Sequence, residues 1–426
     1  MSGFNLVRPR YVSTSNTVKP AIISTDYSQY LERTAGLVMV DTVGLSLDFA
    51  DIDLLNAVAR VNDTDEPGQQ RRWAKQSLRG ASGRQSIALS TKTVKVGKGL
   101  VVPGGPKTHT QLHVEGSVAM HVQGQNIVSS ADVPMLAYQL FKAVNGQTPL
   151  VVPSSRKLDI ARGLDAEVTR IDVAVMLRVP KALTKAAVIN AIAVAAAKAR
   201  LPISLYPNET VYFDQHSQYC AGKLYDKAQQ LEDKDAKGGD RVSDSLRQLA
   251  DRTIRMEFVF RKKYFRNHPE LKGKKAYPVW FTKERLAFML LEQLDRISVK
   301  GHLPRRLDKY DLLSIPLPYR HAVAHWQNGM SVRDFYNSDR TLREHRTFIQ
   351  NNFHSIDILG PAPVTIDGDI DLMDLISPAN FVPVPDEIRA DKQAFFEENM
   401  EPIIERLKCA VGSGISGVFV DPYSLD

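Results

Sequence analysis

Strands along this chain are indicated by runs in which apolar and polar residues alternate. The alternation is strong at residues 167–179 (EVTRIDVAVMLRV) and 253–260 (TIRMEFVF), and partial at residues 37–49 (LVMVDTVGLSLDF). The other predicted strands are residues 86–102 and 108–123, joined by a turn at 103–106 (PGGP), and a hairpin at residues 213–227 (FDQHSQYCAGKLYDK). We expect the second strand of this hairpin to end with Tyr225 and Lys227 on one face.

Helical periodicity separates these strands and dominates the last third of the chain. The predicted helices between the strands are residues 133–144, 184–200, 227–237 and 243–251. Beyond residue 275 the predicted helices are residues 282–297, 319–328, 338–352 and 386–408. Thr184 and Ser338 are suited to cap the helices that they precede.

The order of these elements predicts an α+β fold. A mostly antiparallel sheet would pack its apolar face against helices and leave its other face polar, and a helical C-terminal domain would follow. We expect a flexible arm at residues 1–35, which are rich in Ser, Thr and Pro, and a sheet domain at residues 36–266. Residues 266–275 are expected to link it to a mainly helical domain at residues 276–426.

Composition narrows the function classes. The 426 residues are 43% hydrophobic and 24% charged, which is typical of globular proteins, and the net charge of +7 suits a polyanionic partner. Two cysteines exclude a disulfide framework and a multi-cysteine zinc site. The most apolar run, residues 186–197, is too short to span a bilayer, and the N-terminus lacks the apolar core of a signal peptide. We therefore expect a cytoplasmic protein with no membrane partner.

Four predicted strands each place two chemically active side chains two residues apart, on one face of the strand. The pairs are His113 and Glu115, Arg170 and Asp172, Arg255 and Glu257, and Tyr225 and Lys227. If the apolar faces of these strands all pack against helices, the four pairs converge on the opposite face of the sheet.

Such a convergence would suit phosphodiester chemistry. The expected metal ligands are His113, Glu115, Asp172 and Glu257, a mostly oxygen set that suits Mg²⁺ or Mn²⁺. A metal there would polarise a phosphodiester oxygen. Tyr225 would attack phosphorus, and Lys227 would assist its deprotonation or offset charge. Arg170 and Arg255 would hold phosphates or orient the carboxylates.

Several of these segments resemble a known family in their order and approximate spacing. The segments QLHVEGSVAMHVQGQNI, TRIDVAV, TVYFDQHSQYCAGKLYDK and RMEF are similar to the replication initiator encoded by gene II of filamentous phages, within a wider group of phage and plasmid rolling-circle replication proteins. The resemblance covers residues 37–265 and extends more weakly beyond them. It implies that residues 36–266 form a nicking endonuclease domain with a ferredoxin-like antiparallel sheet.

The resemblance also implies roles for individual residues. Tyr225 matches the tyrosine that nicks one DNA strand and stays joined to its 5′-phosphate. His113-Val114-Glu115 resembles the His-hydrophobic-His metal motif of rolling-circle endonucleases, with a glutamate in place of the second histidine. The implied activity is metal-dependent nicking and joining at a replication origin in the host cytoplasm. The implied partners are duplex origin DNA, the displaced single strand, and a host helicase and polymerase.

Two basic regions are further candidates for DNA contact. The first is Arg71, Arg72 and Trp73, within the polar stretch 62–84. This stretch is either a mobile loop or a phosphate-contacting loop in which Trp73 stacks on a base. The second is Arg340, Arg343 and Arg346 on the predicted helix 338–352. That helix belongs either to a helix-turn-helix-like unit or to a bundle with a solvated basic face.

Two other functions compete with the nicking hypothesis. A non-catalytic regulator that binds an origin or operator would use the basic regions alone, but it would not need four polar strand pairs. A tyrosine recombinase would form a 3′-phosphotyrosine in an arginine-rich, helical, metal-free site. We rank it lower because Tyr225 lies on a predicted hairpin beside carboxylates.

Overall fold

The computed structural model describes most of the chain. The described residues are 29–49, 73–81, 83, 85–95, 108–147, 152–181, 183–198, 201–206, 209–235, 242–297, 307, 309–328, 330–353, 356–359 and 372–412. Arg71, Arg72, the expected turn at 103–106 and the expected arm as far as residue 28 lie outside them.

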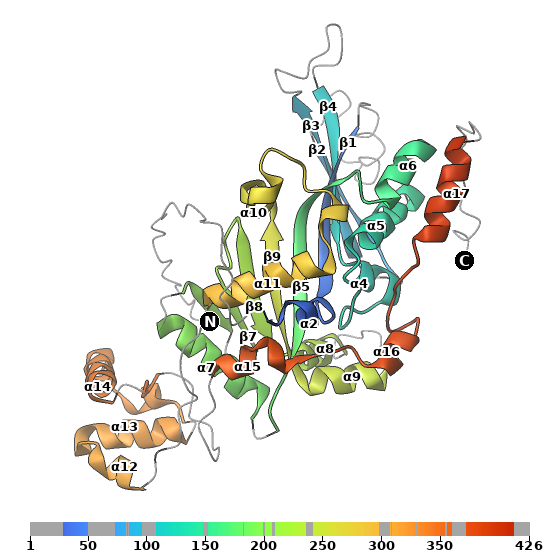
Figure 1. Cartoon of the computed structure of the whole chain (residues 1–426). Coiled ribbons are helices and arrows are strands. Elements are labelled where there is room, and N and C mark those ends of the chain that lie inside the picture. Colours follow the sequence, from blue (N-terminus) through green and yellow to red (C-terminus); the bar gives the residue numbers. More distant parts are fainter. Residues whose placement is uncertain are drawn as a thin grey trace.

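One sheet of ten strands forms the centre of the molecule (Figure 1). Its spatial order is β2 (Trp73–Arg79), β3 (Gln85–Lys95), β4 (Thr108–Gly116), β1 (Met39–Phe49), β5 (Glu167–Arg178), β9 (Thr253–Arg261), β8 (Cys220–Tyr225), β7 (Thr210–Phe213) and β6 (Ile203–Tyr206). The short β10 (Phe381–Val382) pairs with β5 outside this order. The pairings are antiparallel. The α+β fold predicted from the alternation is confirmed.

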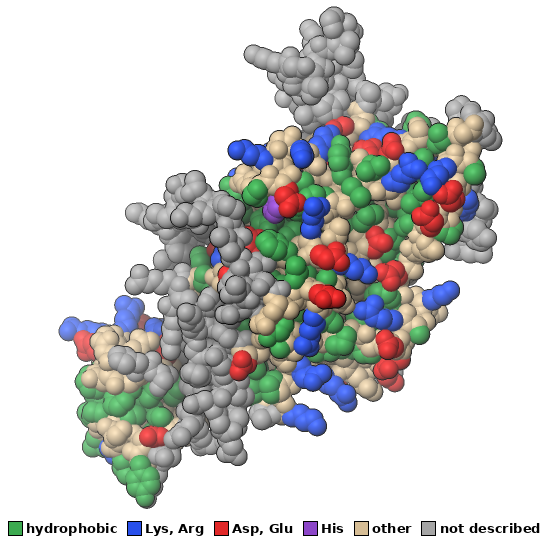
Figure 2. Space-filling view, viewed as in Figure 1, with side chains coloured by type: hydrophobic (Ala, Val, Ile, Leu, Met, Phe, Trp, Pro, Cys, Tyr) green, Lys and Arg blue, Asp and Glu red, His purple; other side chains and the backbone are tan. Residues whose placement is uncertain are grey.

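The apolar face of the sheet is covered by helices. They include α2 (Leu31–Ala35), α5 (Val133–Gln147), α7 (Lys185–Lys198) and α11 (Lys283–Ile297) (Figure 1). Leu140 of α5, Ile192 of α7 and Leu290 of α11 join one core with Phe258 of β9. Over the part of this side shown in Figure 2, described cationic and anionic side chains are interspersed, so no continuous basic surface marks it as a DNA-binding face.

A smaller core lies against one end of the opposite face. It contains residues from α8 (Lys227–Asp235), α9 (Asp244–Asp251) and α16 (Asp386–Ala390). Leu231 of α8 and Leu246 of α9 pack there with Met39 of β1 and Met176 of β5. The polar face is therefore partly covered, and its charged side chains are drawn into the interior.

Two local departures from the sequence prediction lie beside this face. The expected strand 108–123 ends at Gly116, because Ser117 caps the helix α4 (Val118–Gln123) by accepting a hydrogen bond from the Met120 amide. Lys227 is the first residue of α8 and does not extend β8. Asp226 caps this helix, since its carboxylate accepts the Ala228 amide at 2.9 Å.

Other elements also differ from the prediction. The strand β2 lies where the sequence suggested a loop, and it is paired along its length with β3. The predicted helix 386–408 is two helices, α16 and α17 (Glu401–Gly412), because the intervening chain turns inward to bury Ala394 and Phe395. The helix predicted at residues 133–144 corresponds to α5, which continues to Gln147.

The expected boundary at 266–275 does not coincide with the packing. This stretch carries the end of α10 (Lys262–Asn267) and the turn η1 (Pro269–Leu271), and Leu271 and Ala276 are buried in the main core. Beyond it, η2 (Pro278–Trp280) and α11 pack on the sheet domain. Further along, α15 (Leu372–Ile376), η4 (Pro378–Asn380) and β10 return to it, and α17 packs on α6 (Ser154–Ala161).

A separate helical unit lies between these returning segments. It consists of α12 (Lys309–Ser314), α13 (Leu317–Gln327), η3 (Val332–Phe335) and α14 (Asp339–Asn352). Its own core includes Trp326, Leu342 and Ile349. The Ser338 hydroxyl accepts the Thr341 amide at 3.4 Å, so the predicted cap of α14 is confirmed. No helix among the described ranges has both the length and the hydropathy to cross a membrane.

Candidate active site on the polar face of the sheet

Strand register places the polar pairs on one face of the sheet. Gly44 of β1 lies opposite Glu115 on one side and opposite Arg170 on the other. Ala174, two positions beyond Asp172, lies opposite Glu257, and Glu257 in turn lies opposite Lys223 of β8. Directly paired residues share a face. The convergence expected from the alternation is therefore present for β4, β5, β9 and β8.

Three carboxylates meet at the centre of this face. Each of Asp41, Asp172 and Glu257 is buried, and carboxylate oxygens of the three lie within 4.8 Å of one another. Asp172 and Glu257 were expected here from the sequence, but Asp41 was not. Asp41 lies at an irregularity in the β1–β5 register between Val40 and Thr42. A bulge of this kind re-aims a side chain, which strict alternation does not foresee.

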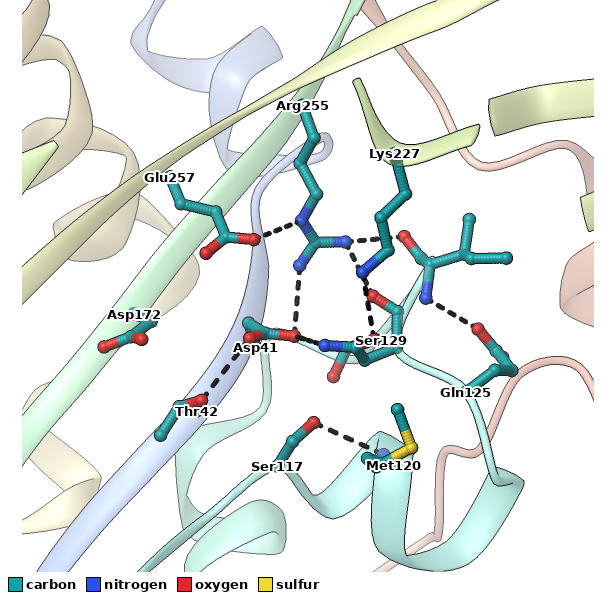
Figure 3. A network of polar contacts seen from close by, with 12 residues as sticks. Asp41, Thr42, Ser117, Met120, Gln125, Ser129, Asp172, Lys227, Arg255 and Glu257 are labelled. Carbon is teal, nitrogen blue, oxygen red and sulfur yellow. Dashed lines mark hydrogen bonds and ion pairs between the residues drawn. The ribbon is translucent and has the colours of Figure 1, made fainter. Parts of the chain in front are cut away.

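Cations surround the three carboxylates. Arg255 Nε bonds Glu257 at 2.7 Å, and Lys223 Nζ lies 2.5 Å from the other Glu257 oxygen. Arg255 also lies 3.3 Å from Asp41 (Figure 3). Burial alone would raise the pKa of Glu257, but Arg255, Lys223 and Lys227 outweigh it and lower that pKa to about 2. Glu257 is therefore held as a carboxylate at neutral pH.

Asp172 has the opposite balance. Its pKa is raised to about 6, chiefly because the carboxyl group is buried, and the nearby charges of Glu257 and Asp41 raise it further. Arg170 opposes this shift through two hydrogen bonds of 2.7 and 2.6 Å. A carboxylate cluster that resists full ionisation attracts a cation, because a bound cation relieves the repulsion.

Tyr225 ends β8 beside this cluster. Its hydroxyl donates a 2.5 Å hydrogen bond to Glu257 Oε1, and only 5% of the residue is exposed. Burial and then the Glu257 charge raise the pKa of the phenol well above its usual value. The ammonium groups of Lys223 and Lys227 lie 5.0 and 5.6 Å from the ring centroid, within the range of cation–π interactions.

Lys227 reaches the site from α8. It is almost completely buried, and its ammonium donates to Asn126 Oδ1 at 3.0 Å and to Gln230 Oε1 at 2.9 Å. Lys223 is the more accessible lysine, and sequence reasoning missed it. The signal was available, since Lys223 stands two residues before Tyr225 on the same strand.

The expected His113–Glu115 metal pair lies away from the carboxylate cluster. Glu115, whose side chain is 46% exposed, reaches it only through Arg170, which bonds Glu115 and Asp172 at 2.6 Å each. His113 lies two residues before Glu115 on β4, between Ser46 and Ser90 of the flanking strands. Neither residue belongs to the three-carboxylate cluster, and Asp41 does.

The expected DNA-contacting residues are in different settings. Arg255 is completely buried, and it donates to the carbonyls of Asn126 and Ile127 at 2.8 and 2.7 Å, so in this structure it orients carboxylates and does not face solvent. Arg170 is 26% exposed. Trp73 begins β2. The remaining described candidates, Arg340, Arg343 and Arg346, lie on α14 in the helical unit.

Comparison with known proteins assigns the sheet domain to a family. Residues 39–279, which contain the whole candidate site, match the Phage CRI family model, which describes the N-terminal part of a replication-associated protein. The chain belongs to this family. The Phage CRI match begins at the first residue of β1, so it includes Asp41, and it ends within η2. The resemblance to gene II-type replication initiators is therefore confirmed.

The chain also has a weaker similarity to solved structures. A rolling-circle replication initiator protein from Geobacillus stearothermophilus shares 14% identity, over 53% of this chain and 74% of its own, with a TM-score of 0.23. That likeness is too low to carry an argument about the site. No curated protein matches the chain.

The donor set of this Phage CRI family member suits a divalent metal. Three carboxylates from adjacent strands offer hard oxygen ligands within one coordination sphere, as Mg²⁺ and Mn²⁺ prefer. The same oxygens are also ion-paired. The anions are Asp41, Glu115, Asp172 and Glu257, and the cations are Arg170, Lys223, Lys227 and Arg255. Their formal charges cancel, so an added cation would be favoured most when an anion arrives with it.

Proposed function

We propose that this protein is a rolling-circle replication initiator that nicks one strand of its origin by tyrosine transesterification. The observation that carries the proposal is the placement of Tyr225. Its hydroxyl is hydrogen-bonded to Glu257 inside a three-carboxylate cluster, within a domain of the Phage CRI replication family. A buried tyrosine hydroxyl needs some hydrogen-bond acceptor, but this one is ionised, belongs to the carboxylate cluster, and is accompanied by two lysines beside the ring.

The scissile phosphate reaches the site beside Arg170 and Lys223. These cations are each 26% exposed, whereas Asp172 and Glu257, with which they pair, are buried. An arriving phosphodiester takes both cations as partners and frees oxygens of Asp172 and Glu257. A divalent metal held by Asp41, Asp172 and Glu257 would then supply Lewis-acid stabilisation of charge on the phosphoryl oxygens.

This exchange also makes Glu257 a better proton acceptor. With Arg255, Lys223 and Lys227 around it, Glu257 has a pKa near 2 and takes a proton poorly. When Lys223 turns to the phosphate, one cation that lowers the pKa of Glu257 is removed, which favours proton transfer to this carboxylate. The Tyr225 proton passes along the existing 2.5 Å hydrogen bond to Glu257 as the phenolic oxygen attacks.

The step conserves a phosphodiester. The Tyr225 oxygen forms a bond to phosphorus, and the bond from phosphorus to the 3′-oxygen breaks. The 5′ end stays on the tyrosine, and the 3′-oxygen leaves and takes a proton to become a 3′-hydroxyl. That hydroxyl primes a polymerase while a helicase displaces the strand. Reversal of the same reaction joins ends, so no nucleotide hydrolysis is required.

The direct test is covalent capture of DNA. The protein is incubated with Mg²⁺ or Mn²⁺ and single-stranded oligonucleotides that tile its replicon, denatured in detergent, and separated by gel. We expect an adduct between the protein and the 5′-phosphate at one cut site, and we expect Tyr225→Phe to abolish it. Tyr219→Phe, six residues earlier in the same hairpin, is the matched control and should retain it. An adduct with Tyr225→Phe would exclude Tyr225 as nucleophile.

The same assay separates the competing functions. Specific DNA binding without an adduct at any metal concentration would identify a non-catalytic regulator. An adduct between the protein and a 3′-phosphate at the cut would identify recombinase chemistry.

A further inference from the structure

Asn126 lies at the junction of the metal cluster and the nucleophile. Its carboxamide nitrogen donates to Asp41 Oδ1 at 2.7 Å, and its carboxamide oxygen accepts from Lys227 Nζ at 3.0 Å. Its backbone carbonyl accepts from Arg255 at 2.8 Å. Figure 3 shows Asp41, Lys227 and Arg255 pointing to one place in front of the sheet.

We propose that Asn126 is a positioning residue for the nicking reaction. This inference rests on the function proposed above. One side chain fixes the carboxylate that completes the metal triad and the ammonium beside the Tyr225 ring. Neither contact can be reversed, because a carboxylate only accepts hydrogen bonds and an ammonium only donates them. The amide is therefore locked in one orientation, and it sets the separation of the two charged groups.

The loop that carries Asn126 is held in turn by a C-terminal strap, residues 391–398. Gln123 and Gln125 both donate to the Ala394 carbonyl at 2.6 Å, and the Phe396 amide donates back to Gln123. Gln125 also accepts the Ile127 amide at 2.6 Å. This bond fixes the backbone next to Asn126.

The strap makes further contacts along the same loop and the helix that follows it. Ser130 donates to Glu397 at 3.0 Å, and Gln139 is hydrogen-bonded to Glu398. Ala394 and Phe395 are buried in one core with Ile127 and Val128. The family match ends at residue 279, so a segment more than a hundred residues further along supports the site. The C-terminal part of the chain is thus a component of the site architecture.

Mn²⁺ binding to the full-length protein without DNA tests this proposal independently of nicking. Electron paramagnetic resonance gives the free Mn²⁺ and hence the half-saturating concentration. Loss of an outer contact to a metal ligand typically costs about 10–100-fold in affinity. For Asn126→Ala we therefore expect the half-saturating Mn²⁺ concentration to rise by about 10–100-fold. Asn328→Ala, whose side chain caps a carbonyl in the helical unit, is the matched control and should bind as the wild type does.

A second variant keeps the proposal testable if Asn126→Ala does not fold. Gln125→Ala leaves Asn126 and every charged group in place but removes one anchor to the strap. We expect a smaller rise in half-saturating Mn²⁺, because Gln123 still holds Ala394. Adduct formation by Asn126→Ala should recover partly at high Mn²⁺, whereas Asp41→Asn should not recover.

The outcomes separate this proposal from the proposed function. Wild-type Mn²⁺ affinity in both folded variants would overturn the positioning role, even if the wild type nicks DNA. Weakened Mn²⁺ binding in the variants of a protein that forms no adduct would uphold the role of Asn126 in arranging the metal site and overturn the nicking function. Absence of Mn²⁺ binding by the wild type would overturn the positioning role, because Asp41 would then hold no metal.

Discussion

Tyr225 and Glu257 share a 2.5 Å hydrogen bond across the β8–β9 pair, and both side chains are buried. The same Glu257 carboxylate also pairs with Arg255 and Lys223. One carboxylate therefore orients the candidate nucleophile and neutralises a fully buried guanidinium. Stability and chemistry are coupled at this residue, because any change that frees the tyrosine also leaves a charge uncompensated.

Glu257→Gln is expected to destabilise the protein by about 3–5 kcal/mol. Removing one partner of a buried ion pair leaves the other charge without compensation, and here both Arg255 and Lys223 lose a partner. The matched control is Glu115→Gln, whose pair with Arg170 is partly exposed and should be worth at most about 1 kcal/mol. Chemical denaturation of both variants measures the difference. Equal losses would show that the Glu257 network is no more important than a surface pair.

Alternation predicted the sheet and the face on which the polar pairs meet, because side-chain direction in a strand depends only on local period. It predicted the proximity of Asp172, Glu257 and Tyr225 for the same reason. It missed Asp41, because a bulge breaks the period and depends on pairing with β5. It placed Lys227 both at the end of the hairpin strand and at the start of the helix predicted at 227–237, and the Asp226 cap shows that Lys227 belongs to the helix.

The remaining errors come from contacts distant in sequence. Asn126 lies in a polar turn, and only the folded chain brings it to Asp41, 85 residues earlier. The break between α16 and α17 is stabilised by packing of Ala394 and Phe395 on residues near 127. Local propensity carries no information about either contact.

Asp172 should make the metal-free protein lose stability between pH 4 and 6. Its pKa is about 6 in the folded state and near 3.8 in the unfolded state, so folding favours the protonated form. The contribution is fully present below pH 3.8 and is lost as the pH rises through 6. The difference of about two pKa units corresponds to about 3 kcal/mol.

Unfolding free energies measured by denaturant across this pH range check the sign. In Asp172→Asn the unfolding free energy should not fall with pH in this way. Glu257 affects stability in a different pH range, because its pKa is lowered on folding. Its contribution to the free energy of unfolding is lost only as the pH falls from 4.5 toward 2. The same slope between pH 4 and 6 in the wild type and in Asp172→Asn would contradict the assignment.

Lys223 and Lys227 should affect nicking in different ways. Lys223 is partly exposed beside the triad, so Lys223→Met should weaken DNA binding and slow adduct formation by about 10²–10³-fold, as for other donors to a reacting oxyanion. Lys227 is buried and bonded to Asn126, so Lys227→Met should slow the reaction at saturating DNA and leave the DNA dissociation constant unchanged. Single-turnover kinetics with titrated oligonucleotide distinguish the two. Identical defects would show that the lysines have one shared role.

Arg343 is the residue of α14 best placed to bind a DNA phosphate. Arg346 is paired with Asp357 at 2.7 and 2.8 Å, and Arg340 is paired with Glu344. Arg343 is exposed, and within the described part of the chain no ion pair engages it. Arg343→Ala should therefore weaken duplex binding and reduce the slope of log K against log salt by about 0.9.

Fluorescence anisotropy with labelled duplex DNA at several salt concentrations measures that slope. Arg346→Ala is the internal comparison, since loss of its bonds to Asp357 should destabilise the helical unit instead of changing the slope. Circular dichroism during thermal unfolding separates the two effects. An unchanged slope in Arg343→Ala, with both variants folded, would mean that α14 presents a solvated basic face and that DNA is bound elsewhere on the molecule.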